Sequence, residues 1–347
     1  MRRRGAVMRR ACVWLVMVGL VMGILTIAGV SERANASMPE YTLQLAGAYS
    51  SAQPTPRVLA AKFFQELVDK RFGGKVKVEL YLDTKLGGDR ETLEGCQAGN
   101  IAMVSLTTAP MVGFVPKLAV FDIAMLFDNL DVAKKALDTF KTKLIPDYEK
   151  AGFKLLMFTP ISFRELTTKK PVTKLEDLKG LKIRTMENKY HVAFWKALGA
   201  NPTPLNFAEL YIALQQGIVD AQENPYDVIW GSKFYEVQKY LVHTHHICFI
   251  FTYVMNKKLF ESMPADYQKM LTDTVNEVSD YLFEESKKQA GAMLAELKSK
   301  GMEVVEITPE MKTGMREAAK TVVKMVKDAV GGEIVDDLLL AVQAASK

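Results

Sequence analysis

An alternation of short apolar strands with amphipathic helices constrains the fold of this chain more than any other feature. Tyr41–Ala46 and Val76–Leu82 alternate apolar and polar residues, the period of a strand with one buried face. Arg57–Arg71 and Asp89–Ala98 instead place apolar residues at helical spacing. Ile101–Leu106 follows as a third apolar strand bounded by turn residues. This order is typical of an α/β domain with mostly parallel strands.

The remaining residues continue the mixture and indicate two domains. Further strands are predicted at residues 154–158, 181–184, 203–205, 220–223, 252–256 and 304–307. Helices are predicted at residues 131–150, 189–198, 206–216 and 265–300, and again near the C-terminus with a break at 331–332. Because single cores rarely grow beyond roughly 250–300 residues, the roughly 310 residues that follow the export signal described below are expected to form two domains.

The N-terminus has the pattern of an export signal. A basic region that includes Arg9 and Arg10 precedes an almost wholly apolar run at residues 11–30. The small-residue motif Ala34-Asn35-Ala36 then predicts cleavage near Ala36, which makes residues 1–36 a signal peptide and places the mature chain in the periplasm. The alternative is an uncleaved anchor, since the apolar run is long enough to span a bilayer.

Charge and motifs exclude several classes of function. Removing the six arginines and one glutamate of residues 1–36 from the 45 basic and 40 acidic residues of the chain leaves 39 of each. A mature chain with no net charge gives no indication of nucleic-acid binding, which requires a basic face. The sequence contains neither a G-x-S-x-G elbow nor an H-E-x-x-H motif. We therefore expect neither an enzyme nor a cofactor.

Cysteines and histidines offer little chemistry. Cys96 and Cys248 are too few for a disulfide framework, and we expect two buried or isolated thiols, although an exported chain could pair them. His243, His245 and His246 are clustered, and alternating histidines on a strand could face one metal ion. No carboxylate or cysteine lies beside them at ligand spacing, so no metal site is expected.

One arginine and one asparagine stand out on residue type alone. Arg184 ends a short apolar strand, where a guanidinium requires a counter-charge. Its planar fork matches a carboxylate, which can belong either to a ligand or to an internal acid. Asn224 precedes Pro225, which favours extended backbone, but an Asn-Pro pair is also an ordinary turn signal. Glu223 is expected either to orient Arg184 or to be solvated.

Three segments around these residues resemble one family. KGLKIRT (179–185), GANPTPLNFAELYIALQQGIVDAQENP (199–225) and KFYEVQKYL (233–241) look like the solute-binding subunits of TRAP transporters, the tripartite ATP-independent periplasmic transporters. The resemblance implies a two-lobed periplasmic-binding-protein fold with crossing strands and a long helix that spans both lobes. Lobe one would comprise residues 37–161 and 250–289, lobe two residues 162–249 and 290–330, and a helical tail residues 331–347. Ligand would bind in the cleft between the lobes.

The resemblance also assigns ligand contacts in lobe two. Arg184 is expected to bind a substrate carboxylate through two parallel hydrogen bonds. Arg164, in SFRELTTKKP, matches a second arginine that often contacts the ligand; the alternatives are an exposed side chain or a pair with Glu165. Asn224 is expected to contact the ligand, and Phe207 to pack on its carbon skeleton unless it belongs to the core.

Lobe one is expected to complete the site. Tyr49 and Ser50 lie on the loop after the first strand, where hydroxyl and backbone N–H groups suit anions. Asp89, in LGGDR, matches a family turn; it is expected foremost to cap the next helix, and it is also a candidate ligand contact. Thr107 and Pro110 stand where sialic-acid-binding members carry a glutamate and an arginine. Sialic acid is therefore not the expected solute.

The resemblance implies a non-enzymatic function in transport. The chain is expected to capture an organic acid such as a dicarboxylate, close around it and deliver it to the integral-membrane TRAP permease, which an ion gradient drives. A monomer is expected. The alternatives are a binding protein that serves a sensor, with the same pocket and another partner, and a secreted hydrolase or lyase.

Overall fold

The computed structural model of the protein describes residues 40–347, and Tyr41–Lys347 form one compact unit. The expected signal peptide and its cleavage site lie outside the described residues. Within residues 40–347, no helix combines the length and the apolar character needed to cross a membrane.

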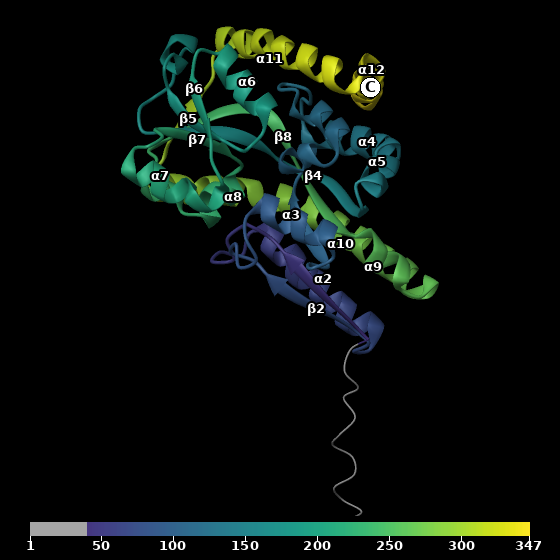
Figure 1. Ribbon diagram of the computed structural model, residues 1–347. Helices are drawn as coiled ribbons and strands as arrows, with labels where there is room; N and C mark the ends of the chain where they lie inside the picture. Colours follow the sequence, from purple (N-terminus) through teal and green to yellow (C-terminus); the bar gives the residue numbers. More distant parts are fainter. Residues whose placement is uncertain (1–39) are drawn as a thin grey trace, which may run out of the picture. The chain divides into compact units, whose positions relative to one another are not determined.

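A nine-stranded mixed sheet runs through this unit (Figure 1). Its order is β2-β1-β3-β8-β4-β7-β5-β6, with β9 beside β8. The strands are β1 (Tyr41–Ala46), β2 (Val76–Tyr81), β3 (Met103–Thr107), β4 (Phe153–Thr168), β5 (Lys182–Thr185), β6 (Asn201–Pro204), β7 (Ala221–Asn224), β8 (Tyr240–Asn256) and β9 (Glu303–Glu306). The short strands β1, β2 and β3 pair in parallel, as do β5, β6 and β7, which confirms the predicted arrangement for them. The long strands differ, because β8 is antiparallel to both β3 and β4.

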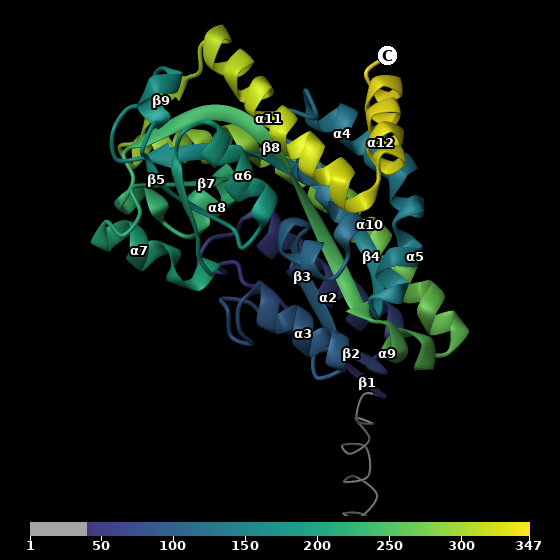
Figure 2. The ribbon, with the colours of Figure 1, turned by 45° about the horizontal axis from the view of Figure 1, so that its top comes forward.

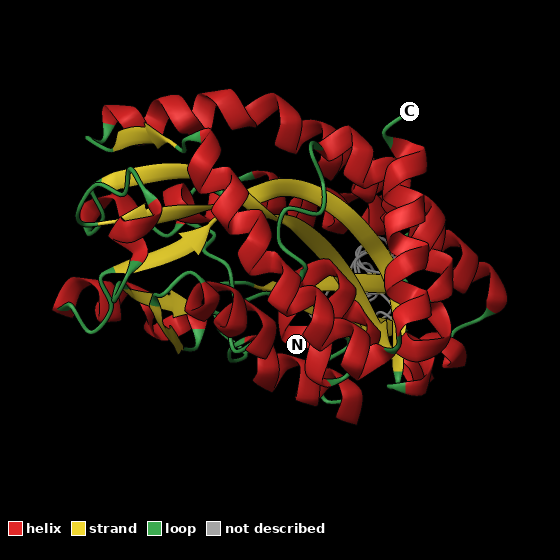
Figure 3. Cartoon of the chain, turned by 90° about the horizontal axis from the view of Figure 1, so that it is seen from above, coloured by secondary structure: helices red, strands yellow, loops and turns green. Residues whose placement is uncertain are grey.

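Helices cover both faces of the sheet (Figure 3). They are α2 (Pro56–Phe72), α3 (Asp89–Ala98), α4 (Leu130–Phe140), α5 (Ile145–Lys150), α6 (Lys189–Ala197), α7 (Leu210–Gln216), α8 (Tyr226–Gly231), α9 (Lys257–Ser262), α10 (Ala265–Ser299), α11 (Pro309–Val330) and α12 (Gly332–Ala345). Successive residues of β3 supply two separate cores, since Met103 packs in one and Val104 in the other. Cys96 and Cys248 are buried and not bonded to each other, as expected.

β4 and β8 are much longer than the strands predicted at residues 154–158 and 252–256. Pro160 lies inside β4, where a proline normally argues against a strand because it cannot donate to the ladder. The register with β8 shifts between Pro160 and Ser162, so a bulge accommodates the missing donor. β8 is buried along nearly its whole length and therefore lacks the alternation that reveals a strand.

The helix predicted at residues 131–150 is wrong as a single element. It is divided into α4 and α5, with a short 3-10 turn between them. Pro146 lies in the first turn of α5, where its missing N–H costs nothing, and the same residue would break a continuous helix. The start of α4 is well defined, since the Asn129 side chain accepts from the N–H of Val132 at 2.9 Å.

The sheet holds two groups of short strands apart. We call β1, β2 and β3 with α2 and α3 the β1–β3 group, and β5, β6 and β7 with α6, α7 and α8 the β5–β7 group. β4 and β8 run between the groups, and Figure 2 shows β8 as one continuous ribbon across the unit. Helix α10, about 52 Å long at about 1.5 Å per residue, contacts α2, β4 and α8 and so touches both groups. The predicted crossing strands and long helix are both present.

Candidate functional site

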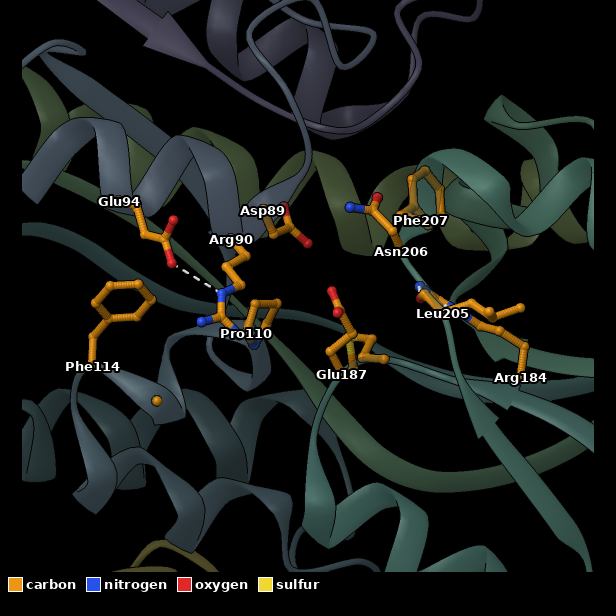
Figure 4. Close-up of a pocket in the computed structure, with 12 residues that line it drawn as sticks. Asp89, Arg90, Glu94, Pro110, Phe114, Arg184, Glu187, Leu205, Asn206 and Phe207 are labelled. Atoms are coloured by element: carbon orange, nitrogen blue, oxygen red, sulfur yellow. Dashed lines mark hydrogen bonds and ion pairs between the residues drawn. The ribbon is translucent and has the colours of Figure 1, made fainter.

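Two adjoining cavities lie between the β1–β3 group and the β5–β7 group. The outer cavity has a volume of about 240 Å³, and the inner one about 40 Å³. Both are lined by Asp89, Arg184, Met186 and Phe207, which makes them neighbouring parts of one cleft. In Figure 4 the side chains of Asp89, Arg90 and Glu94 on α3 face those of Glu187, Asn206 and Phe207 across the outer cavity.

Arg184 on β5 is buried and has no acidic partner within 4.0 Å among the described residues. Its Nε and Nη2 donate to the backbone oxygen of Leu205 at 3.0 and 2.7 Å, which fixes the guanidinium in place. Its buried Nη1 finds no hydrogen-bond partner in the part of the chain that is described. Burial and the charge of Arg164 lower its pKa to about 10, against the effect of Glu223, Asp89 and Glu187, so it stays protonated near neutral pH. The alternative that an internal acid pairs with Arg184 is therefore wrong.

Arg164 on β4 has an internal partner, although a different one from the alternative considered above. Its Nε donates to Glu223 Oε2, and its Nη2 donates to Glu223 Oε1 at 3.0 Å in a bidentate pair. Glu165, the next residue of β4, contacts His245 instead. The buried Nη1 of Arg164 is unpartnered within the described residues, and Arg164 lines the inner cavity.

Glu223 is the centre of a buried charge network and is neither solvated nor paired with Arg184. Besides Arg164 it contacts His246, whose Nε2 lies 3.0 Å from Oε2, and His191, whose Nδ1 lies 3.8 Å from Oε1. The other ring nitrogen of His191 lies 3.0 Å from Asp122 Oδ1. Burial alone would raise the pKa of Glu223, but Arg164 and the two histidines outweigh it and hold that pKa well below the usual range.

The charge of His191 makes stability depend on pH. Burial alone would lower its pKa, but the hydrogen bond that the ring donates to Asp122, its contact with Glu223, and the charges of these two carboxylates outweigh burial and raise it to about 9. The pKa of His191 is therefore higher in the folded protein, at about 9, than the ordinary value of 6.5. The protonated ring stabilises the fold fully below about pH 6.5, and this contribution is lost as the pH rises through about 9. We expect the free energy of unfolding from urea titrations to fall by about 3 kcal/mol over that range. His191→Gln should show a flatter profile; equal slopes in the two proteins would show that the ring is neutral when folded.

Asn224 and Phe207 both lie at the cleft. Asn224 ends β7 and lines the inner cavity, and its side-chain oxygen accepts from Arg164 Nη2 at 2.9 Å. Its amide nitrogen donates to Gln222 at 2.6 Å, so the amide orientation is set by neighbours on both sides. The Phe207 ring centroid lies 5.8 Å from Arg184 Cζ, and the ring packs edge-on against Phe234 at 6.1 Å. Phe207 thus contacts both the cavity and the adjacent core.

The residues expected from lobe one divide into those that line the cleft and one that does not. Tyr49 and Thr107 line the inner cavity, and the Tyr49 hydroxyl lies 3.2 Å from that of Ser105. Ser50 lines neither cavity; its hydroxyl accepts from the N–H of Ala52 at 3.2 Å within the loop. The loop therefore presents an aromatic hydroxyl to the cleft, and its first serine stabilises the turn.

Asp89 lines both cavities, and the expectation that its side chain caps α3 is wrong. The N-cap is Gly88, without a side-chain bond, and Asp89 is the first helical residue. Part of the side chain stays accessible from the cleft, yet enough protein surrounds the carboxyl that burial raises its pKa to about 6. Arg184 and Arg57 act in the opposite direction, while Glu91 and Glu187 add to the rise.

Sequence reasoning missed an ion pair that joins the two groups. Arg57, at the start of α2, donates through Nε to Asp227 of α8 at 2.6 Å, and both side chains are buried. The guanidinium also stacks over Tyr49, with Cζ 4.6 Å from the ring centroid. The partners are 170 residues apart. Periodicity carries no signal for such a pair, because it describes only local neighbours.

The clustered histidines contact other side chains of the described chain. Within residues 40–347 no group of three or more His, Cys, Asp or Glu side chains has the arrangement to hold a metal ion. His243 instead contacts Glu306 and the hydroxyl of Tyr226, and His246 points into the buried network. These side chains have structural partners.

Two solute-binding proteins are similar to this chain in sequence over most of its length. A solute-binding protein of Verminephrobacter eiseniae is 36% identical over 259 residues, which cover 74% of this chain and 77% of the relative. The 2,3-diketo-L-gulonate-binding periplasmic protein YiaO of Escherichia coli is 33% identical over 283 residues, or 81% of this chain and 86% of that protein.

Solved structures show the same fold. The sugar acid binding protein DctPAm of Advenella mimigardefordensis, in complex with galactonate, matches with a TM-score of 0.84 at 32% identity, over 88% of this chain and 98% of that one. A TRAP periplasmic solute binding protein of Sulfurospirillum deleyianum with bound succinate matches with a TM-score of 0.82 at 30% identity, over 89% and 100%. The two-lobed fold class expected from the sequence is thereby confirmed.

The family evidence spans nearly all of the described chain. The family described as bacterial extracellular solute-binding protein, family 7, matches residues 47–328, from the end of β1 to the last turn of α11. Those residues include every side chain that lines the two cavities. The chain therefore belongs to family 7 of the bacterial extracellular solute-binding proteins, the solute-binding subunits of TRAP transporters.

Proposed function

We propose that this protein binds an organic acid by its carboxylate at Arg184 and delivers it to a TRAP permease in the membrane. The observation that carries the proposal is a buried guanidinium with an unpartnered Nη1 and no acid within 4.0 Å in the described chain. Burying a charge without a partner is costly, so a ligand carboxylate that completes the pair gains strongly. 2,3-Diketo-L-gulonate, galactonate and succinate, named for the similar proteins, are all organic acids.

The remaining contacts follow from the cavity lining. Arg164 and Asn224 would complete the carboxylate end, and Phe207 would pack on the carbon skeleton. From the other side of the cleft, Tyr49, Thr107 and Asp89 would contact the rest of the ligand. Ser50 is left out because it lines neither cavity.

Closure requires that ligand touch both sides of the cleft. A ligand shifts an open–closed equilibrium only by its differential affinity for the two states. The cavities are lined from both the β1–β3 group and the β5–β7 group, so a bound acid would bridge them. We propose the lobe division 37–161 with 250–289 and 162–249 with 290–330, with the tail at 331–347. We also propose cleavage near Ala36, a periplasmic monomer, and no catalytic role.

A thermal-shift panel of matched compounds tests the carboxylate reading. Gluconate is compared with glucitol and succinate with succinamide, so that each pair differs in charge and retains the carbon chain. An acid at about a hundred times its dissociation constant should add about 2.7 kcal/mol of stability. Neutral partners should add none. Stabilisation by neutral or cationic compounds alone would overturn the proposal.

A further inference from the structure

We propose that the cleft selects an acid with one carboxylate and several hydroxyl groups, a monocarboxylic sugar acid, over a dicarboxylate. The inference rests on the proposed function, in which Arg184 holds the carboxylate. It concerns the other end of the ligand. The argument comes from the balance of charges that line the two cavities.

Four arginines line the cavities, and three of them already have acidic partners. Arg57 pairs with Asp227 at 2.6 Å, and Arg90 pairs with Glu94 at 3.0 Å. Arg164 pairs with Glu223 in the bidentate contact described above. Among the cavity-lining residues of the described chain, Arg184 is the one cation without a counter-charge. Arg184 is therefore the one cation in the described lining that is free to pair directly with a ligand carboxylate.

The unpartnered Nη1 of Arg164 does not provide a separate site for a second carboxylate. Arg164 and Arg184 both line the inner cavity, whose volume is about 40 Å³. Glu223 compensates the charge of Arg164. The unpartnered Nη1 of Arg164 can therefore donate to the same carboxylate that Arg184 holds.

The rest of the cleft lining includes two acidic groups without a close basic partner. Asp89 lines both cavities and Glu187 lines the outer one, and neither has a basic side chain within 4.0 Å among residues 40–347. Figure 4 shows both carboxyl groups beside the cavity, with Asn206 opposite. Once one ligand carboxylate pairs with Arg184, a second would meet these like charges with no further unpaired cation in the described lining to offset them.

Hydroxyl groups are the complementary partners for this lining. An ionised carboxylate only accepts hydrogen bonds, and a hydroxyl donates one. Asp89 and Glu187 can accept from sugar hydroxyls, while the hydroxyl of Thr107 in the inner cavity can both donate and accept. Hydrogen bonds to charged acceptors are among the strong ones. A polyhydroxy chain thus satisfies groups that a bare hydrocarbon chain with a second carboxylate leaves unmet.

Calorimetric titration of the protein near neutral pH tests the inference. The probes are a set of aldonates of increasing chain length, succinate, and uncharged glucitol. We expect at least one aldonate to bind tenfold or more tightly than succinate. Asp89→Asn and Glu187→Gln, which remove charge at constant size, should each lower the ratio of aldonate to succinate affinity about tenfold. Asp69→Asn, an exposed carboxyl on α2 that lines neither cavity, should leave the ratio unchanged.

The outcomes separate the two proposals. Succinate binding as tightly as every aldonate would overturn the sugar-acid inference and leave carboxylate binding intact. Unchanged ratios in both the Asp89 and Glu187 variants, with normal folding, would also overturn it. Binding of glucitol with no binding of any acid would overturn the proposed function as well.

Discussion

Replacing Arg184 by alanine should reduce acid binding by about thirty-fold to several thousand-fold, while the protein stays folded. Loss of one partner from a buried charge pair typically costs about 2–5 kcal/mol of binding free energy. The free energy of unfolding should change less than the binding free energy, because the variant removes a buried cation that has no acidic partner in the described part of the structure. Titration calorimetry measures the first effect and urea unfolding the second.

Two further variants show whether geometry or charge matters at this position. Arg184→Lys keeps the charge and loses the planar fork, so it should recover only a small part of the affinity. Arg71→Ala is the control, because it removes an arginine on α2 whose side chain is 30% exposed and contacts Glu277. The Arg71→Ala protein should bind the acid with wild-type affinity. Wild-type affinity in Arg184→Ala would show that the carboxylate binds elsewhere.

Replacing Glu223 by glutamine should destabilise the protein by about 3–5 kcal/mol, the largest stability effect expected here. The variant leaves Arg164 buried without a counter-charge and weakens the contacts with His191 and His246. Chemical denaturation in the absence of ligand measures the loss. Glu277→Gln is the matched control, because it breaks the exposed pair of Glu277 with Arg71. The side chains of Arg71 and Glu277 are 30% and 47% exposed, and such exposed pairs contribute less than about 1 kcal/mol to stability.

A double variant separates loss of the charge pair from loss of packing. Arg164→Met combined with Glu223→Gln removes the uncompensated charge and keeps the volume. It should be less destabilised than the sum of the two single variants, because the two residues interact directly. Additive losses would mean that Arg164 finds another partner when Glu223 is absent.

Local patterns predicted the short elements well. β1 and α3 have the predicted bounds, and α10 ends one residue before the predicted Lys300, next to Gly301 with its φ of 93°. These elements follow from periodicity and terminal signals, which act between residues close in sequence. β4 and β8 were underestimated because a buried bulge admits Pro160 and because strands buried on both faces lose their alternation.

In the candidate site, the residues were predictable from the sequence, but their charge partners were not. Residue type and resemblance drew attention to Arg184, Arg164 and Asn224, and the structure brings all three to one cleft. Sequence could not show that Arg164 is paired and Arg184 is not, although both arginines lie on apolar strands. Glu223 is 59 residues from Arg164, and strand pairing decides which carboxylate each guanidinium meets.

The sequence by itself determined the chemical groups available to this protein: α/β elements, an arginine suited to a carboxylate, and no recognised catalytic motif. Tertiary structure decided which charges cancel. Arg57 with Asp227 and Arg164 with Glu223 neutralise one another only because the chain folds distant strands and helices together. The charge left over, at Arg184, is a property of the assembled cleft, since electrostatic pairing depends on distance in space and burial.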